Sequence, residues 1–368
     1  MNNDQFNAAI EALHADNDLA DRALARARSD QRRRRRRGAA KPISAVVAMA
    51  VAALLATGGA AYAVVNSDFF ATAWGDHGGG QTQSYSTTWD DGSVHTYTME
   101  YGDGTASDEL EDYVEHVGIT LEANGYTLTV EDIAMDANAA GAVTMTLSNP
   151  DGVGYYEPAA ATGELSFDAY AGGLSSITMW FDDDFADEYC AIDRDASTPT
   201  EVHFTMYFAG QNGADDLGRG ITWRLDWSSG SGYYTDGNSG AQTDAFHSTK
   251  QIGVKRFSLD DGTFAEISPF SVRTQVVQPE CKELVHAADA VKRIALEFAD
   301  GSEQVVYESL SSTIGSYFGL IREDGSAIHV PTKLIDPAEV TAVEMEAKRI
   351  YSEDGHDALG DLFTVTLE

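Results

Sequence analysis

The acidic stretch WFDDDFADEYCAIDRDAS, residues 180–197, is the densest run of side chains that could do chemistry. Calcium takes several carboxylate or carbonyl oxygens at about 2.3–2.6 Å, and an acidic loop outside the cytoplasm could supply them. The calcium candidates are Asp182, Asp184, Asp187 and Glu188. Because the stretch lacks the DxDxDG spacing of an EF-hand, we interpret it as a solvated acidic loop and predict that it holds no metal.

The two cysteines of the chain, Cys190 and Cys281, give a second possible covalent feature. If this part of the chain lies in an oxidising compartment, a disulfide between them would tie its two halves together. Two independent buried thiols are the alternative, because a disulfide also depends on a geometry that the sequence does not fix. No CxxC or Cys/His spacing indicates a zinc site.

Catalytic and cofactor motifs are missing from the sequence. It contains no GxSxG, HExxH, GxxxxGK[ST] or SxxK with KTG, and no GxGxxG after a strand. The nine histidines are scattered without metal-ligand spacing. Trp180, Trp223 and Trp227 could line a sugar-binding face, although alternation places at least some of them in a core. We therefore predict no catalytic residues, no cofactor and no enzymatic activity.

The charge of the chain argues against a nucleic acid as a partner. Its formal net charge is −35, with 59 Asp and Glu against 24 Lys and Arg. Residues 42–193 contain neither Lys nor Arg, so this part has no cluster that could displace the counterions of a nucleic acid. Since 43% of the residues are apolar and 10% aromatic, the acidic part is predicted to be globular.

A membrane span is predicted at residues 43–65, which carry no charged side chain. At a rise of about 1.5 Å per residue, this run is about 34 Å long and can cross a hydrocarbon layer of about 30 Å. A basic block precedes it and is expected to orient the span with the N-terminus in the cytoplasm, close to anionic lipid head groups. The orienting residues are Arg32, Arg33, Arg34, Arg35, Arg36, Arg37 and Lys41.

A cleaved signal peptide is the alternative to a retained anchor. Ala61-Tyr62-Ala63 is an A-x-A-like site, which would place the cleavage after Ala63. The long polar segment before the apolar run, and the length of that run, favour an uncleaved single span. Both interpretations put the acidic part outside the cytoplasm.

The first 30 residues are predicted to form one or two short amphipathic helices with an apolar stripe. The stripe residues are Phe6, Ile10, Leu13, Leu19 and Leu24, and we expect them to bind a partner. A segment this short cannot bury a core of its own, so the stripe needs a protein or the inner leaflet as its counterpart. A charged helical spacer without a partner is the alternative.

The part after residue 66 is rich in short alternating segments separated by Gly, Asp, Asn and Ser, which is typical of antiparallel β structure. Asn124-Gly125 and Asp300-Gly301 mark two hairpin turns. We predict an all-β ectodomain of two antiparallel sandwich-like domains, preceded by a short cytoplasmic helix and one transmembrane helix. The predicted parts are a cytoplasmic head at 1–42, the span at 43–65, a stem at 66–108 that adds a strand or hairpin, a first β domain at 109–244 and a second at 245–368.

The order of these parts resembles a family of membrane-anchored, anti-sigma-factor-like proteins of Gram-positive bacteria with a β-rich ectodomain of unknown function. The segments that carry the resemblance are the basic block before the span, HVGITLEANGYTLTVEDIAMDANAAGAVTMTLSNPDG, LEFADGSEQVVY and KLIDPAEVTAVEM. The resemblance implies an inner head that holds a sigma factor and an outer module that senses the envelope. The head is short for a sequestering domain and has no Cys/His zinc motif.

The sequence therefore predicts a single-pass protein of the cell membrane, with its C-terminal region outside the cytoplasm and an unknown ligand there. Its β domains would act without catalysis as an envelope sensor or binding module, and the head would regulate a sigma factor. The alternative function is a cell-surface adhesin or carbohydrate-binding protein, whose N-terminus is only an anchor or export signal.

Overall fold

The computed structural model describes residues 69–75, 82–88, 93–104, 108–156, 166–167, 174–227, 240–278, 288, 290–309, 311, 313–353 and 356–368. All of them belong to one compact unit, Val65–Glu368. The predicted head with its partner-binding residues, the basic block, the span at 43–65 and Cys281 lie outside the described residues. Within the described ranges, no helix is long and apolar enough to cross a membrane.

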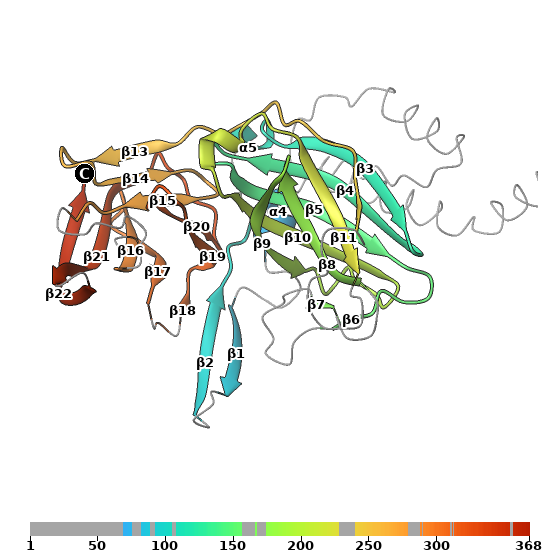
Figure 1. The fold of residues 1–368 in the computed structure, drawn as a ribbon, viewed down its shortest axis with the longest axis horizontal. Coiled ribbons are helices and arrows are strands. Elements are labelled where there is room, and N and C mark those ends of the chain that lie inside the picture. Colours follow the sequence, from blue (N-terminus) through green and yellow to red (C-terminus); the bar gives the residue numbers. More distant parts are fainter. Residues whose placement is uncertain are drawn as a thin grey trace, which may run out of the picture. The chain divides into compact units, whose positions relative to one another are not determined.

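The chain is mostly antiparallel β-sheet with few helices, as the alternating segments predict (Figure 1). The elements up to residue 242 are α4 (Phe69–Trp74), β1 (Thr82–Thr88), β2 (Val94–Glu100), α5 (Asp108–Glu111), β3 (Glu115–Ala123), β4 (Tyr126–Met135), β5 (Ala140–Ser148), β6 (Tyr155–Tyr156), β7 (Ser166–Phe167), β8 (Leu174–Phe181), β9 (Asp184–Ile192), β10 (Glu201–Gly210), the 3₁₀ helix η1 (Gly213–Asp216), β11 (Ile221–Trp227) and β12 (Ala241–Gln242). The later elements are β13 (Lys255–Ser258), β14 (Phe264–Ile267), β15 (Val272–Gln275), β16 (Val291–Phe298), β17 (Glu303–Glu308), β18 (Thr313–Ile314), β19 (Ser316–Ile321), β20 (Ala327–Pro331), β21 (Val340–Glu353) and β22 (His356–Leu367).

An eight-stranded antiparallel sheet, ordered β12-β11-β8-β9-β10-β5-β4-β3, forms the first part. The predicted hairpin at Asn124-Gly125 joins β3 to β4, with Ala123 paired to Tyr126. Both turn residues have positive φ, 51° and 83°, which is the conformation that a two-residue type I′ turn requires.

This sheet folds over at the β8–β9 hairpin. The two strands pair only beside their turn, where Trp180 faces Phe185 and Phe181 faces Asp184. Beyond that point β8, β11 and β12 pack across a core against the remaining five strands. That core contains side chains of both sets, such as Trp223 and Met206. Side chains of both sets of strands therefore share one core.

The second part contains two antiparallel sheets that face each other. One is ordered β13-β14-β15-β20-β19 and the other β17-β16-β21-β22. Their shared core combines Ile267 and Val272 of the first sheet with Ile294 and Val343 of the second. The predicted Asp300-Gly301 turn joins β16 to β17, and Gly301 has φ +82°. Apolar residues of both sheets therefore share this core.

The stem contributes a hairpin, β1–β2, as predicted, and also a helix that the sequence does not predict (Figure 1). In this helix, α4, the side chains of Phe69, Phe70, Ala73 and Trp74 are fully or almost fully buried. Burying a large aromatic side chain contributes about 1.5–3 kcal/mol, so the stem belongs to the folded core.

A central core joins α4 to both β parts. Trp74 stacks on Phe270 with ring centroids 5.0 Å apart and meets Tyr207 edge-on at 5.6 Å. Its indole Nε1–H donates to the Pro331 carbonyl at 3.2 Å. On the outer face of the eight-stranded sheet, small side chains leave room for these rings. They are Ala134, Ala140, Ala142, Ala191 and Ala209.

A buried carboxylate provides a polar link between the two β parts. Asp136, at the end of β4, accepts hydrogen bonds from the hydroxyls of Ser268 and Ser271, the latter at 2.6 Å. Its other oxygen accepts the backbone N–H groups of Asn138 at 2.8 Å and Ala140 at 3.1 Å. Four donors therefore satisfy a carboxylate that has no exposed surface.

Candidate functional site

The acidic stretch is not the loop that its composition indicates. Residues Asp184–Ile192 form strand β9, and only Asp182 and Asp183 lie in the turn that precedes it. Asp182 has φ +53°, a conformation that Asp tolerates better than most residues. The strand forms because Ala186, Ala191 and Ile192 bury their side chains. In the sequence, the many carboxylates between these residues make the apolar positions of the strand hard to recognise.

The guanidinium of Arg219 lies among the carboxylates that are the calcium candidates. Arg219 donates from Nε to Asp182 at 3.2 Å, and from Nη1 to Asp184 at 2.5 Å and Asp216 at 2.9 Å. Its guanidinium holds the pKa of Asp184 below its usual range, mainly through the hydrogen bond from Nη1 to Asp184. Asp187 lies further along β9, where it accepts from the Gln211 amide at 3.3 Å. In the described part of the chain, no group of three His, Cys, Asp or Glu residues is placed to hold a metal ion.

Glu188 has a structural environment different from those of the other calcium candidates. Its Oε2 accepts the backbone N–H of Met179 at 2.9 Å, at the point where β8 and β9 have separated. The carboxylate thus replaces a missing strand-to-strand hydrogen bond. Burial, with additional repulsion from Asp187 and Asp226, raises the pKa of Glu188 to about 8.

Glu188 is expected to make the stability of the fold depend on pH. Because its folded pKa is raised above the ordinary value of 4.5, its contribution is fully present below that value and is lost as pH rises through about 8. The variant Glu188→Gln keeps the acceptor for Met179 and cannot ionise. Urea unfolding of both proteins between pH 5 and pH 9 should show a steeper loss in the wild type, and parallel curves would contradict this.

The other residues singled out from the sequence are not brought together. Cys190 lies half-buried in β9 against the first core, while Cys281 is outside the described residues, so the disulfide remains a prediction. Trp223 is fully buried in that core. Trp180 lies under the Arg224 guanidinium, 5.1 Å from its ring centroid, and Trp227 packs at the edge of the same core. The three indoles therefore do not form one exposed sugar-binding face.

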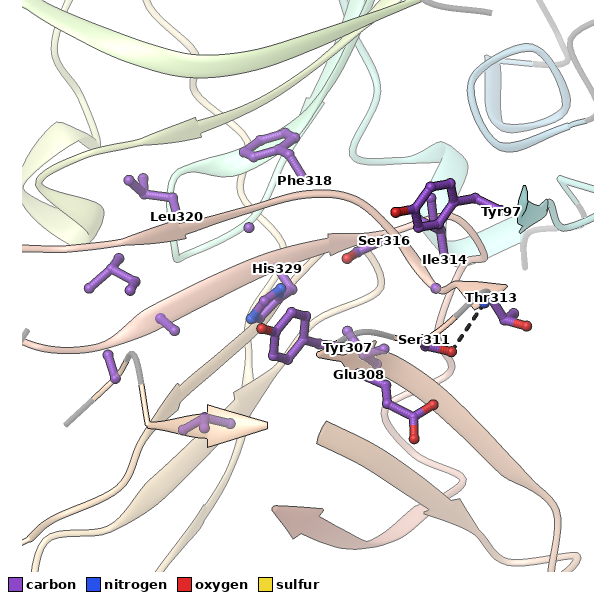
Figure 2. A pocket seen from close by; sticks show the side chains of 17 residues that line it. Tyr97, Tyr307, Glu308, Ser311, Thr313, Ile314, Ser316, Phe318, Leu320 and His329 are labelled. Atoms are coloured by element: carbon purple, nitrogen blue, oxygen red, sulfur yellow. Dashed lines mark hydrogen bonds between the residues drawn. The ribbon is translucent and has the colours of Figure 1, made fainter. Parts of the chain in front are cut away.

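A cavity of about 360 Å³ lies beside the second β part and is the strongest candidate site (Figure 2). Residues of six strands line it: Tyr97 of β2, Val291 of β16, Val306, Tyr307 and Glu308 of β17, Thr313 and Ile314 of β18, Ser316, Phe318, Gly319, Leu320 and Ile321 of β19, and Ala327 and His329 of β20. Ala288, Ser311 and Gly315 complete the wall. Its volume is at the lower end of the range for small-molecule sites.

The stem forms one wall of this cavity. Strand β18 pairs in parallel with β2, Thr313 with Thr98 and Ile314 with Met99. This pairing brings the Tyr97 side chain to the cavity. A segment that follows the predicted span by about 30 residues therefore contacts the same space as strands more than 200 residues later in the chain.

His329 is the polar group buried most deeply in the wall, with 7% of its surface exposed. Its ring stacks on Tyr307 with centroids 4.7 Å apart, and Nδ1 is buried without a hydrogen-bond partner. Burial lowers the pKa of His329 to about 4, so the imidazole is neutral at pH 7.

Gly319 explains how the imidazole fits. It is paired directly with His329 across β19 and β20, and a Cβ at this glycine would lie 2.5 Å from Nδ1. Only a residue without a side chain leaves room for the ring. The sequence shows a histidine in an alternating strand and a glycine ten residues earlier, but it does not show their register, so sequence analysis missed this site.

Comparisons with known proteins add little to this geometry. No protein-family model matches the chain, and no curated protein matches it. Among solved structures, the chain is similar to a conserved domain protein from Bacillus anthracis, with 12% identity and a TM-score of 0.35 over 70% of this chain and 91% of the other. A likeness at this level carries no argument about function.

Proposed function

We propose that this chain is a non-catalytic sensor that binds a ligand through its β-rich part and passes the bound state to its N-terminal side. In this proposal, residues 43–65 are a single membrane span, the head at 1–42 lies in the cytoplasm, and the β-rich part lies outside. The head holds a sigma factor, which the resemblance of the sequence implies. Phe6, Ile10, Leu13, Leu19 and Leu24 form the contact surface for it.

The observation that carries the proposal is the way in which the stem enters the core. Tyr97 of β2 lines the cavity, and the aromatic side chains of α4 contact both β parts. A ligand that displaces Tyr97 changes the position of β2, which follows the predicted span in the chain after α4 and β1. A binding module that used its N-terminus only as a tether would not need a stem built into the binding site.

The head is tested with a tagged full-length chain that is solubilised and used to capture partners from the host's lysate. We expect mass spectrometry to recover one sigma factor, and the double variant Ile10→Ala and Leu13→Ala to reduce its recovery at least tenfold, because two apolar contacts are removed. The matched control is Gln5→Ala and Asn7→Ala, on the polar positions of the same segment. Recovery of no sigma factor would support the adhesin or carbohydrate-binding alternative.

A further inference from the structure

We propose that the cavity binds a small uncharged molecule with an apolar body and one hydrogen-bond acceptor, such as a carbonyl oxygen, which takes the Nε2–H of His329. This inference deepens the proposed function, because it names the class of ligand that the sensor would detect. It depends on three features of the wall: the orientation of the imidazole, the charge of the lining and its apolar character.

The orientation of the imidazole decides which nitrogen carries the proton. Nδ1 points at Gly319, 2.5 Å from the place that a Cβ would occupy there, and no acceptor lies within hydrogen-bond distance of it. A buried N–H without an acceptor costs about 1–3 kcal/mol, whereas a lone pair against a Cα–H group is tolerated. The neutral ring therefore protonates Nε2, the nitrogen that remains accessible where His329 lines the cavity. It offers the ligand a donor.

The charge of the wall excludes anions. None of the described residues that line the cavity is a Lys or an Arg, so a carboxylate or phosphate would lose its hydration without gaining a counter-charge. The imidazole does not supply that charge, because burial holds its pKa near 4.

Cations are excluded because the cavity offers them no buried carboxylate. Glu308 is the carboxylate in the described wall, and its side chain is exposed. Figure 2 shows this carboxylate pointing away from the rings of Tyr307 and His329. A cation inside the cavity would therefore lack a buried partner, and an uncharged ligand has the smallest cost of transfer from water.

The remaining wall suits an apolar body. Apolar side chains in it are those of Val291, Ile314, Phe318, Leu320 and Ala327. The hydroxyls of Ser311, Thr313 and Ser316 add polar groups; that of Ser311 accepts the Thr313 backbone N–H at 3.1 Å (Figure 2). An apolar ligand with a single acceptor buries its surface against the first set and directs its oxygen to His329.

Four probes of similar size separate these features: acetophenone with an acceptor, ethylbenzene without one, benzoate as an anion and benzylamine as a cation. The full-length chain is labelled with ¹⁵N in its histidine rings and titrated with each probe.

We expect the His329 signals to show the Nε2–H tautomer and to shift saturably with acetophenone. Ethylbenzene should bind about tenfold more weakly, and benzoate and benzylamine should cause no saturable shift. Comparable affinities for acetophenone and ethylbenzene, a Nδ1–H tautomer, or no response to acetophenone would overturn the proposal.

The variant His329→Phe keeps the ring and removes the donor, so equilibrium dialysis should find acetophenone and ethylbenzene bound equally. His247→Phe, which changes an exposed histidine in the first part, is the matched control and should keep the preference. If His329→Phe does not fold, the titration of the wild type still decides the matter. If acetophenone is preferred over ethylbenzene through His329 but no sigma factor is recovered, this inference stands and the proposed signalling is rejected. If a sigma factor is recovered but His329 gives no such preference, only this inference is rejected.

Discussion

Replacing Trp74 by alanine is expected to lower the free energy of unfolding by about 3–5 kcal/mol, the usual cost of removing a large buried aromatic side chain. The indole is fully buried, stacks on Phe270 and donates to the Pro331 carbonyl. Its removal leaves a cavity where α4 meets both β parts and leaves one buried carbonyl without its donor.

Urea unfolding of the full-length chain, followed by circular dichroism, measures this loss without relying on tryptophan fluorescence. Tyr113→Ala serves as the control, because it removes an aromatic ring that is 36% exposed and should change stability by less than about 1 kcal/mol. Equal stability of Trp74→Ala and the wild type would mean that the stem is not part of the core.

Removal of the Asp136 carboxylate is the second change with a large expected effect. Asp136→Ala leaves two serine hydroxyls and two backbone N–H groups without their acceptor in a buried position. Each unsatisfied buried donor costs about 1–3 kcal/mol, and partial relaxation reduces the sum, so we expect a loss of about 3–5 kcal/mol. Asp136→Asn keeps one oxygen for the backbone donors and should lose about half as much or less.

The same pair of variants gives a pH test. Burial raises the pKa of Asp136 above its ordinary value of 3.8, despite the four hydrogen bonds. The contribution of Asp136 is therefore fully present below pH 3.8 and decreases as pH rises through the higher folded value. Denaturant titrations from pH 3 to pH 7 should show this decrease in the wild type and not in Asp136→Asn, and an increase over that range in the wild type would show that the hydrogen bonds outweigh burial.

Local signals in the sequence predict much of this fold. The turns at Asn124-Gly125 and Asp300-Gly301 join the strands that alternation predicts, because Asn124, Gly125 and Gly301 tolerate the positive φ that they adopt there. Such features depend on neighbours in the sequence, so they can be recognised without knowing the tertiary contacts.

Long-range contacts decide the features that the sequence does not reveal. Helix α4 has six residues, too few for a clear period, and it is stabilised by Phe270 and Pro331. Strand β9 carries so many carboxylates that its composition indicates a loop. In the structure, Arg219 pairs with Asp184, and the Met179 N–H donates to Glu188. The cavity depends on the register that places Gly319 opposite His329, which alternation alone cannot give.

The contacts of α4 also have a consequence for the order in which the chain folds. A ribosome makes the chain from its N-terminus, so Phe70 and Trp74 emerge long before Tyr207, Phe270 and the Pro331 carbonyl, which is 257 residues from Trp74. Until nearly the whole chain has been synthesised, only part of the native surface that covers these aromatic rings exists. Contacts between distant residues form slowly, and exposed aromatic rings favour aggregation in the interval. Nascent chains that stop before residue 331 should therefore depend on a chaperone that shields this short aromatic segment.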